Sequence, residues 1–170
     1  MNIFAISGSA SIKSTNVLLL KAISELVKEE HHVEVYSKAR ELPLFRPEDL
    51  INELPKSIIN LKEKIKNADA VIIATPEYTH NVPAVLKNII EWTTASGEFM
   101  DKHILPITFT PREPRGQWAM KSLLFSLQTM NAKIVTQLSI YKTDVELHDE
   151  TITLGEDINL ILKEAIKLLA

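Results

Sequence analysis

The 170-residue sequence contains no cysteine, which excludes disulfide bonds, thiolate metal sites, iron–sulfur clusters and thiol redox chemistry. Any electron transfer by this chain must therefore use a bound organic cofactor. Five histidines are present, but His31, His32, His103 and His148 show no metal-ligand spacing with a second ligand. We expect no metal site.

The chain also lacks an excess of positive charge. Its net charge of −3 gives no electrostatic case for binding nucleic acid. No apolar run approaches the roughly 20 residues that a membrane-spanning helix needs, and no charged-then-apolar leader opens the sequence. Hydrophobic residues at 45% and charged residues at 24% are typical of a globular protein. We therefore expect a cytoplasmic protein without nucleic-acid or membrane partners, folded as one domain over residues 1–170.

Strand and helix patterns alternate along the whole chain. The predicted strands are residues 2–6, 32–36, 70–74, 103–109 and 132–136, and the predicted helices are 15–29, 55–67, 83–94, 116–130 and 156–170. Residues 138–149 have no clear pattern. This alternation predicts an α/β fold, with a doubly wound, five-stranded parallel sheet in a three-layer αβα sandwich.

The third predicted strand leads into a loop that is suited to ligand binding. Residues 70–74 are apolar at every position, as in a central parallel strand covered on both faces. Pro76 ends the strand, and Pro83 fits the first turn of the next helix. Open α/β sheets bind ligands at such carboxyl ends. We expect Tyr78 to meet a planar ligand. Glu77 accepts hydrogen bonds from loop amides, contacts a partner subunit or is solvated.

The first strand leads into a second loop of this kind, residues 7–16. It holds five hydroxyl side chains, one glycine and one lysine. Gly8 allows a tight turn, and Ser14 or Thr15 can cap the following helix. The free N–H groups at a helix start favour an anion such as phosphate, and Lys13 adds positive charge. An ordinary capped βα turn is the alternative. The loop is neither a dinucleotide fingerprint nor a P-loop.

Residues 8–16 read GSASIKSTN, and residues 75–92 read TPEYTHNVPAVLKNIIEW. These two segments resemble the motifs of the NADPH-dependent FMN reductase family, roughly G-S-x-R-x-x-S-x-N and T-P-E-Y-N-x-S-x-P-G-x-L-K-N-x-I-D-W. The family is flavodoxin-like and includes quinone, azo-dye and chromate reductases. The LPLF segment at residues 42–45 also looks like the family's L-P-x-[FY] stretch. The resemblance covers about residues 2–140, and its second motif is long and specific.

The resemblance implies a flavodoxin-like fold and an FMN-dependent NAD(P)H oxidoreductase. A hydride would pass from a nicotinamide cofactor such as NADPH, through bound FMN rather than FAD, to a quinone, flavin, azo compound or similar small molecule. No side chain would be catalytic, because the cofactor carries the chemistry. The implied cofactor-binding residues are Ser9, Ser11, Lys13, Ser14, Asn16, Pro76, Glu77, Tyr78, Thr79, Thr110 and Arg112.

The resemblance also implies a homodimer or homotetramer, with the helix around Trp92 and the loop 95–99 as contact surface. Trp92 itself is interpreted as either a core or an interface residue. Lys87 and Asn88 are interpreted as helix-surface or capping groups, and His80 as a plain loop histidine.

The chain departs from the family pattern at several positions. Ser11 stands where the family has an arginine that helps hold the FMN phosphate, and Lys13 lies two positions on. Thr79 replaces an asparagine. The third loop carries TFTPREPRGQ at residues 108–117 instead of a Ser-Gly-Gly-like run, and its Arg112 and Arg115 can hold the phosphates of NADPH. Two alternatives stay open: a non-catalytic FMN electron carrier, and a flavin-free flavodoxin-like binding protein.

Overall fold

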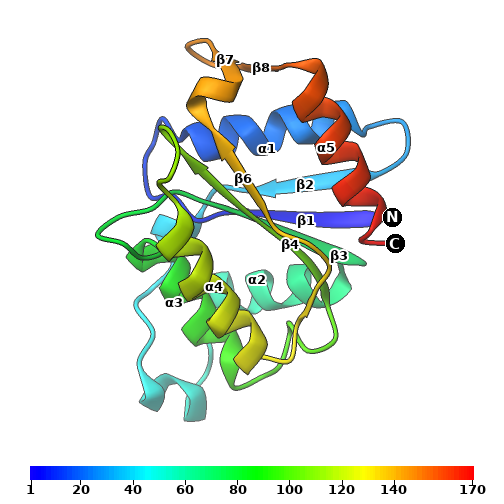
Figure 1. The fold of residues 1–170 in the computed structure, drawn as a ribbon. Helices are drawn as coiled ribbons and strands as arrows, with labels where there is room; N and C mark the ends of the chain where they lie inside the picture. Colours follow the sequence, from blue (N-terminus) through cyan, green and yellow to red (C-terminus); the bar gives the residue numbers. More distant parts are fainter.

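A computed structural model describes all residues, 1–170. Its central sheet is parallel, with the spatial order β2-β1-β3-β4 and two short segments, β5 and β6, along the outer side of β4 (Figure 1). The sheet strands are β1 (Asn2–Ser7), β2 (His32–Tyr36), β3 (Ala70–Thr75), β4 (His103–Thr110), β5 (Lys133–Ile134) and β6 (Leu138–Tyr141). The α-helices are α1 (Thr15–Leu26), α2 (Lys56–Asn67), α3 (Ala84–Thr94), α4 (Gln117–Thr129) and α5 (Glu156–Lys167). The predicted doubly wound αβα sandwich is confirmed.

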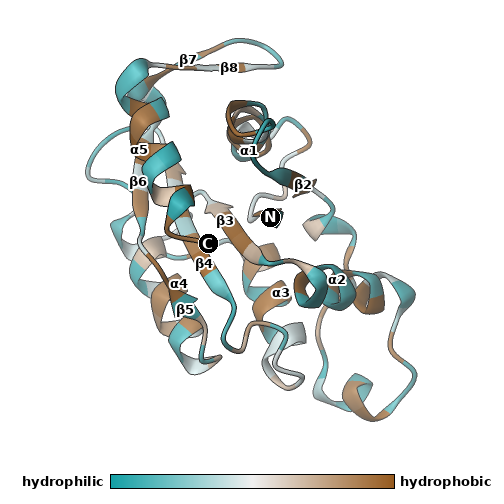
Figure 2. Cartoon of the chain, turned by 90° about the vertical axis from the view of Figure 1, so that its right-hand side faces the viewer, coloured by the Kyte–Doolittle hydropathy of each residue, from teal (hydrophilic) through white to brown (hydrophobic).

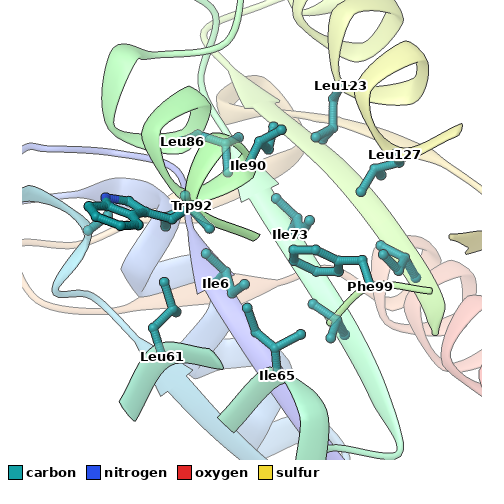
Figure 3. Close-up of a cluster of buried hydrophobic side chains, with 14 of the residues drawn as sticks. Ile6, Leu61, Ile65, Ile73, Leu86, Ile90, Trp92, Phe99, Leu123 and Leu127 are labelled. Carbon is teal, nitrogen blue, oxygen red and sulfur yellow. The ribbon is translucent and has the colours of Figure 1, made fainter. Parts of the chain in front are cut away.

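Two hydrophobic cores lie on opposite faces of the sheet. Helices α2, α3 and α4 cover one cluster. It contains the fully buried side chains of Trp92, on α3, and Phe99, which follows α3 (Figure 3). Helices α1 and α5 bury the other. Every residue of β3 is buried because both layers cover it, and the hydrophobic colouring of β3 and β4 in Figure 2 follows from this position. No helix is both long and apolar enough to cross a membrane.

The fifth strand position differs from the prediction. A single strand at residues 132–136 was expected, but β5 pairs with β4 only at His103 and Ile104, and pairing resumes where β6 meets residues 107–110. The ladder is interrupted at residues 135–137 and then continues to Tyr141. The strand therefore extends into the stretch that has no clear sequence pattern, and its exit loop begins at Lys142.

A β-hairpin follows the sheet and was not predicted. Strands β7 (Val145–Leu147) and β8 (Ile152–Leu154) pair antiparallel, and the hairpin lies over α1 (Figures 1 and 2). Its strands are three residues long, which is too short for a period-2 pattern to stand out in the sequence.

The interpretation of Asn88 as a surface or capping group is wrong. Asn88 is 6% exposed, and its amide accepts from the N–H of Phe45 at 2.8 Å and donates to the carbonyl of Pro43 at 3.0 Å. The indole N–H of Trp92 donates to the same carbonyl at 2.8 Å. These two motif residues fasten the segment after β2 onto α3. Lys87, by contrast, is exposed and pairs with Glu91 at 3.3 Å.

Candidate functional site

A cavity of about 270 Å³ lies at the carboxyl edge of the sheet. The loops after β1, β3 and β4 and the first residue after β6 surround it, so four segments distant in sequence meet there. This is the edge at which open α/β sheets bind ligands. Its lining residues are Ser9, Ser11, Lys13, Ser14, Thr15, Asn16, Pro76, Glu77, Tyr78, Phe109, Pro111, Arg115 and Lys142.

The loop after β1 presents hydroxyl groups and the start of α1 to this cavity. Ser14 is the N-cap residue, and its Oγ accepts from the N–H of Val17 at 3.4 Å. The N–H of Ser11 donates to Oγ of Ser9 at 3.3 Å, which shapes the loop before the cap. The first-turn N–H groups of a helix have no intrahelical acceptor, so those that Ser14 does not bind are available to an anion.

Asn16 is a buried polar residue without a partner. Its side chain is 2% exposed and lines the cavity, and its Oδ1 has no hydrogen-bond donor within the chain. Leaving such a group unpaired costs about 1–3 kcal/mol. A ligand with a hydroxyl or N–H donor in the cavity would remove this cost.

Gly8 is needed for a reason other than the expected tight turn, because its φ is not in the left-handed region. A Cβ at this position would come within 2.9 Å of Cδ2 of Leu86 and 3.0 Å of Oγ1 of Thr75. Only glycine therefore lets the loop after β1 pass closely beside β3 and α3. The N–H of Gly8 donates to the carbonyl of Ala74 at 2.8 Å, which extends the β1–β3 pairing to the edge of the cavity.

Glu77 connects the loop after β3 to the start of α4. Its Oε2 accepts from the backbone N–H groups of Trp118 and Ala119 at 3.0 and 3.1 Å, so the carboxylate caps the start of α4. Glu77 therefore accepts from backbone amides, but these belong to the first turn of α4 and not to a loop as expected. The second carboxylate oxygen lies 3.9 Å from Nδ1 of His80.

The tip of this loop is a strained two-residue turn. Tyr78 and Asn81 exchange backbone hydrogen bonds at 3.0 Å, while Thr79 and His80 between them have φ values of 51° and 57°. Non-glycine residues take this left-handed conformation at an energetic cost that is characteristic of functional loops. Tyr78 is 53% exposed at the mouth of the cavity, whereas Thr79 lies outside it, in a separate hollow of about 200 Å³ beside Arg115.

The loop after β4 places Arg115, and not Arg112, at the cavity. Oγ1 of Thr110 donates to the carbonyl of Arg115 at 2.9 Å and so fixes the position of this loop. Thr110 is buried and does not line the cavity. Gly116 then turns the chain into α4 with a φ of 100°, and a Cβ there would lie 2.8 Å from Oγ1 of Thr108. Arg112 is exposed and away from the lining.

Eight of the eleven predicted cofactor-binding residues line one cavity, and Thr79, Thr110 and Arg112 do not. Sequence reasoning missed Lys142, because the segment before it had no clear strand pattern. Phe109, Pro111 and Thr15 were also absent from the predicted set, although each adjoins a residue or loop that was expected there. Arg115 was considered only as a group for the NADPH phosphates.

The charges around the cavity favour an anion. Lys13, Arg115 and Lys142 line it, and none of these cations forms an ion pair within the chain. The only lining carboxylate, Glu77, is already bound to the start of α4. Cations, serine hydroxyls, a helix start and the unpartnered Asn16 together suit a ligand with one phosphate and several hydroxyl groups. The residues present therefore fit FMN.

The sheet order, with a cavity at the carboxyl edge of the strands, defines a flavodoxin-like fold. Residues 1–144 match the family model of the NADPH-dependent FMN reductases. The chain belongs to this family, which confirms the resemblance seen in the two motifs.

Individual relatives and solved structures agree with the family. The chain is 41% identical over 106 residues to the NADH:(hydroxy)cinnamate reductase subunit CrdA of Vibrio ruber, covering 62% of this chain and 52% of that one. It is 27% identical over 148 residues to an NADPH azoreductase of a Bacillus species, covering 86% and 80%. The flavoenzyme FerB of Paracoccus denitrificans has the same fold, with a TM-score of 0.79, 20% identity and coverage of 99% and 94%. The chain spans about half the length of the first curated relatives that it matches.

Proposed function

We propose that this chain binds FMN in the edge cavity and acts as an NAD(P)H-dependent oxidoreductase on small acceptors such as quinones, flavins or azo compounds. One observation carries the proposal: four separate segments bring three unpaired cations, a helix start and the unpartnered Asn16 to one cavity. Family membership supports it. FMN, when bound, supplies the hydride chemistry.

The residues of the chain have binding and positioning roles in this proposal. Ser9, Ser14 and Asn16 would hold the phosphate end, with Lys13 in place of the family arginine that Ser11 replaces. Pro76 and Tyr78 would lie against the ring. Glu77 fixes the loop after β3 to α4, so that both walls of the ring site keep their spacing.

Absorption spectroscopy and kinetics of the purified chain test the proposal. We expect visible flavin bands, or their appearance on titration with FMN, followed by oxidation of NADH or NADPH in the presence of a quinone. Nicotinamide and acceptor should use the same open side of the ring in turn, which predicts ping-pong kinetics. A chain that binds neither FMN nor FAD would contradict the proposal.

A non-catalytic FMN electron carrier is the second candidate. Two relatives are named as subunits: the cinnamate reductase subunit and an NADH-dependent flavin reductase subunit of Lactobacillus johnsonii. The carrier would bind FMN as tightly as the enzyme would. The FMN-loaded chain would, however, oxidise neither NADH nor NADPH in the presence of excess quinone. That single result distinguishes the two candidates.

A homodimer or homotetramer stays part of the proposal, and the exposed residues of the helix around Trp92 and of the loop 95–99 remain candidates for its contact surface. Of the two interpretations of Trp92, the core is the one observed, and the side chains of Trp92 and Phe99 are both buried away from any contact surface. The exposed aromatics on α4 are Trp118, 44% exposed, and Phe125, 71% exposed, and aromatic residues are enriched at interfaces. Sedimentation equilibrium should show a dimer or tetramer at micromolar concentration, and Phe125→Glu should shift it toward the monomer.

Two further expectations belong to the proposal. Residues 1–170 would form one FMN-binding domain, which limited proteolysis tests by the absence of a stable smaller fragment. The cytoplasmic location is tested by fractionation of cells that produce the protein.

A further inference from the structure

A groove of about 660 Å³ lies between the first turns of α1 and the β7–β8 hairpin. The hairpin begins at Val145, directly after the last residue matched by the family model, so the hairpin wall of the groove lies outside the matched region. Figures 1 and 2 show the hairpin over α1, and β8 packs against that helix.

The groove is continuous with the candidate cofactor site. Lys13, Ser14 and Thr15 line both the groove and the edge cavity. Thr15 is the first residue of α1, Ser14 is its N-cap and Lys13 precedes the cap, so all three lie where a phosphate is expected. A ligand with a phosphate near this point can therefore extend into the groove, which has more than twice the volume of the cavity.

The two walls of the groove carry opposite charges. Lys13 and Lys21 lie on the α1 side, and Asp149 and Glu150 lie on the hairpin side. None of these four side chains forms an ion pair within the chain. The charges are therefore separated across the hollow and remain available to a ligand that carries both phosphates and hydroxyl groups.

The groove also has an apolar part. Ile12 is 84% exposed and Leu147 is 40% exposed, and both line the groove, one from each wall. Exposed aliphatic side chains beside a polar hollow suit a flat ring that is apolar on its faces and polar at its edges. A nucleobase has this character.

We propose that this groove is a subsite for the nucleoside 5′-phosphate half of a dinucleotide, an inference that rests on the proposed function. Lys21 binds the phosphate, beside Lys13 at the FMN phosphate, and the base packs between the side chains of Ile12 and Leu147. Asp149 and Glu150 accept hydrogen bonds from the ribose hydroxyls, as acidic residues do in dinucleotide sites. Their charge opposes a 2′-phosphate, so the subsite favours an unphosphorylated ribose.

Titration of the FMN-saturated protein with 5′-AMP tests the subsite directly, because FMN blocks the neighbouring phosphate site. We expect saturable binding by calorimetry, weakened about fivefold or more by Lys21→Gln. Glu146→Gln is the matched control, because Glu146 lies on the same hairpin but does not line the groove. Absence of 5′-AMP binding, or equal effects of the two substitutions, would overturn the proposal. If FMN does not bind, 5′-AMP is titrated into the unloaded protein, and only weakening by Lys21→Gln supports the subsite, because Lys21 lines the groove and not the edge cavity.

A second titration tests the role of the carboxylates. Adenosine 2′,5′-bisphosphate should bind more weakly than 5′-AMP to the wild type. The double substitution Asp149→Asn with Glu150→Gln should reduce the ratio of the two dissociation constants by about fivefold. Glu146→Gln should leave this ratio unchanged. A bisphosphate that binds as tightly as 5′-AMP to the wild type would contradict the assigned role.

Two further measurements identify the source of the nucleotide half. If Lys21→Gln raises the KM for NADH and leaves the ratio of FAD to FMN affinity unchanged, the subsite serves the nicotinamide dinucleotide. If Lys21→Gln lowers the ratio of FAD to FMN affinity and leaves the KM for NADH unchanged, the subsite serves a flavin dinucleotide. If neither quantity changes, the proposal is overturned. A protein that binds 5′-AMP but oxidises no nicotinamide refutes the proposed function while the subsite stands.

Discussion

Two buried asparagines provide the sharpest test of the candidate site. Asn16 and Asn88 are 2% and 6% exposed, yet Asn88 makes two hydrogen bonds within the chain and Asn16 Oδ1 makes none. We therefore predict opposite consequences when each is replaced by alanine. Asn16→Ala should reduce FMN affinity and leave the stability of the apoprotein nearly unchanged. Asn88→Ala should destabilise the apoprotein and leave FMN affinity nearly unchanged.

The magnitudes follow from the hydrogen bonds. Asn88→Ala removes two bonds of about 1 kcal/mol each and leaves the N–H of Phe45 without its acceptor, so the apoprotein should lose about 2–3 kcal/mol. Asn16→Ala removes no hydrogen bond of the chain and should cost less than about 1 kcal/mol. A ligand hydrogen bond of about 1 kcal/mol, once lost, should weaken FMN binding about fivefold.

Urea unfolding of the flavin-free protein and fluorescence titration with FMN measure the two quantities for each variant. If Asn16→Ala destabilised the apoprotein as much as Asn88→Ala, the Asn16 side chain would have a partner inside the chain. If Asn16→Ala left FMN affinity unchanged, the unpartnered amide would not face the cofactor. Either result would refute the reasoning.

Three further predictions concern the loops around the cavity. Ser14→Ala should weaken FMN binding by about 1 kcal/mol, the scale of one cap or hydrogen bond, and an unchanged dissociation constant would contradict this role. Glu77→Ala should lower the free energy of unfolding by about 1–2 kcal/mol, because the N–H groups of Trp118 and Ala119 lose their acceptor; unchanged urea unfolding would count against it. His80→Ala should keep its activity within about tenfold, or 1.4 kcal/mol, whereas Tyr78→Ala should reduce it further through misplacement of cofactor or substrate. Steady-state rates at equal flavin content measure both, and complete loss in His80→Ala would indicate proton transfer by this histidine.

Local patterns in the sequence were sufficient for most of the fold. The apolar run of β3 predicted a strand covered on both faces, and the alternation of strands and helices predicted the doubly wound sheet. Hydroxyl residues before α1 predicted a cap at Ser14 or Thr15, and Ser14 is the N-cap observed. These features depend on residues close together in the chain, so their physical causes can be recognised without the tertiary structure.

The interrupted fifth strand and the β7–β8 hairpin depend on contacts that the local pattern does not contain. Residues 138–141 form a strand because their backbone pairs with residues 107–110 of β4. That pairing carries Lys142 to the cavity, where no pattern in its own segment had placed it. The three-residue strands of the hairpin likewise owe their stability to pairing and to packing on α1.

The sequence alone determined which residue types would gather at the carboxyl edge, because parallel strands bring their exit loops to one side of the sheet. Only the tertiary structure decided what each side chain does there. It bound Glu77 to the start of α4, gave Asn88 two backbone partners and left Asn16 with none. A polar side chain's role is fixed by the donors and acceptors within about 3 Å of it, and long-range folding brings those groups into place.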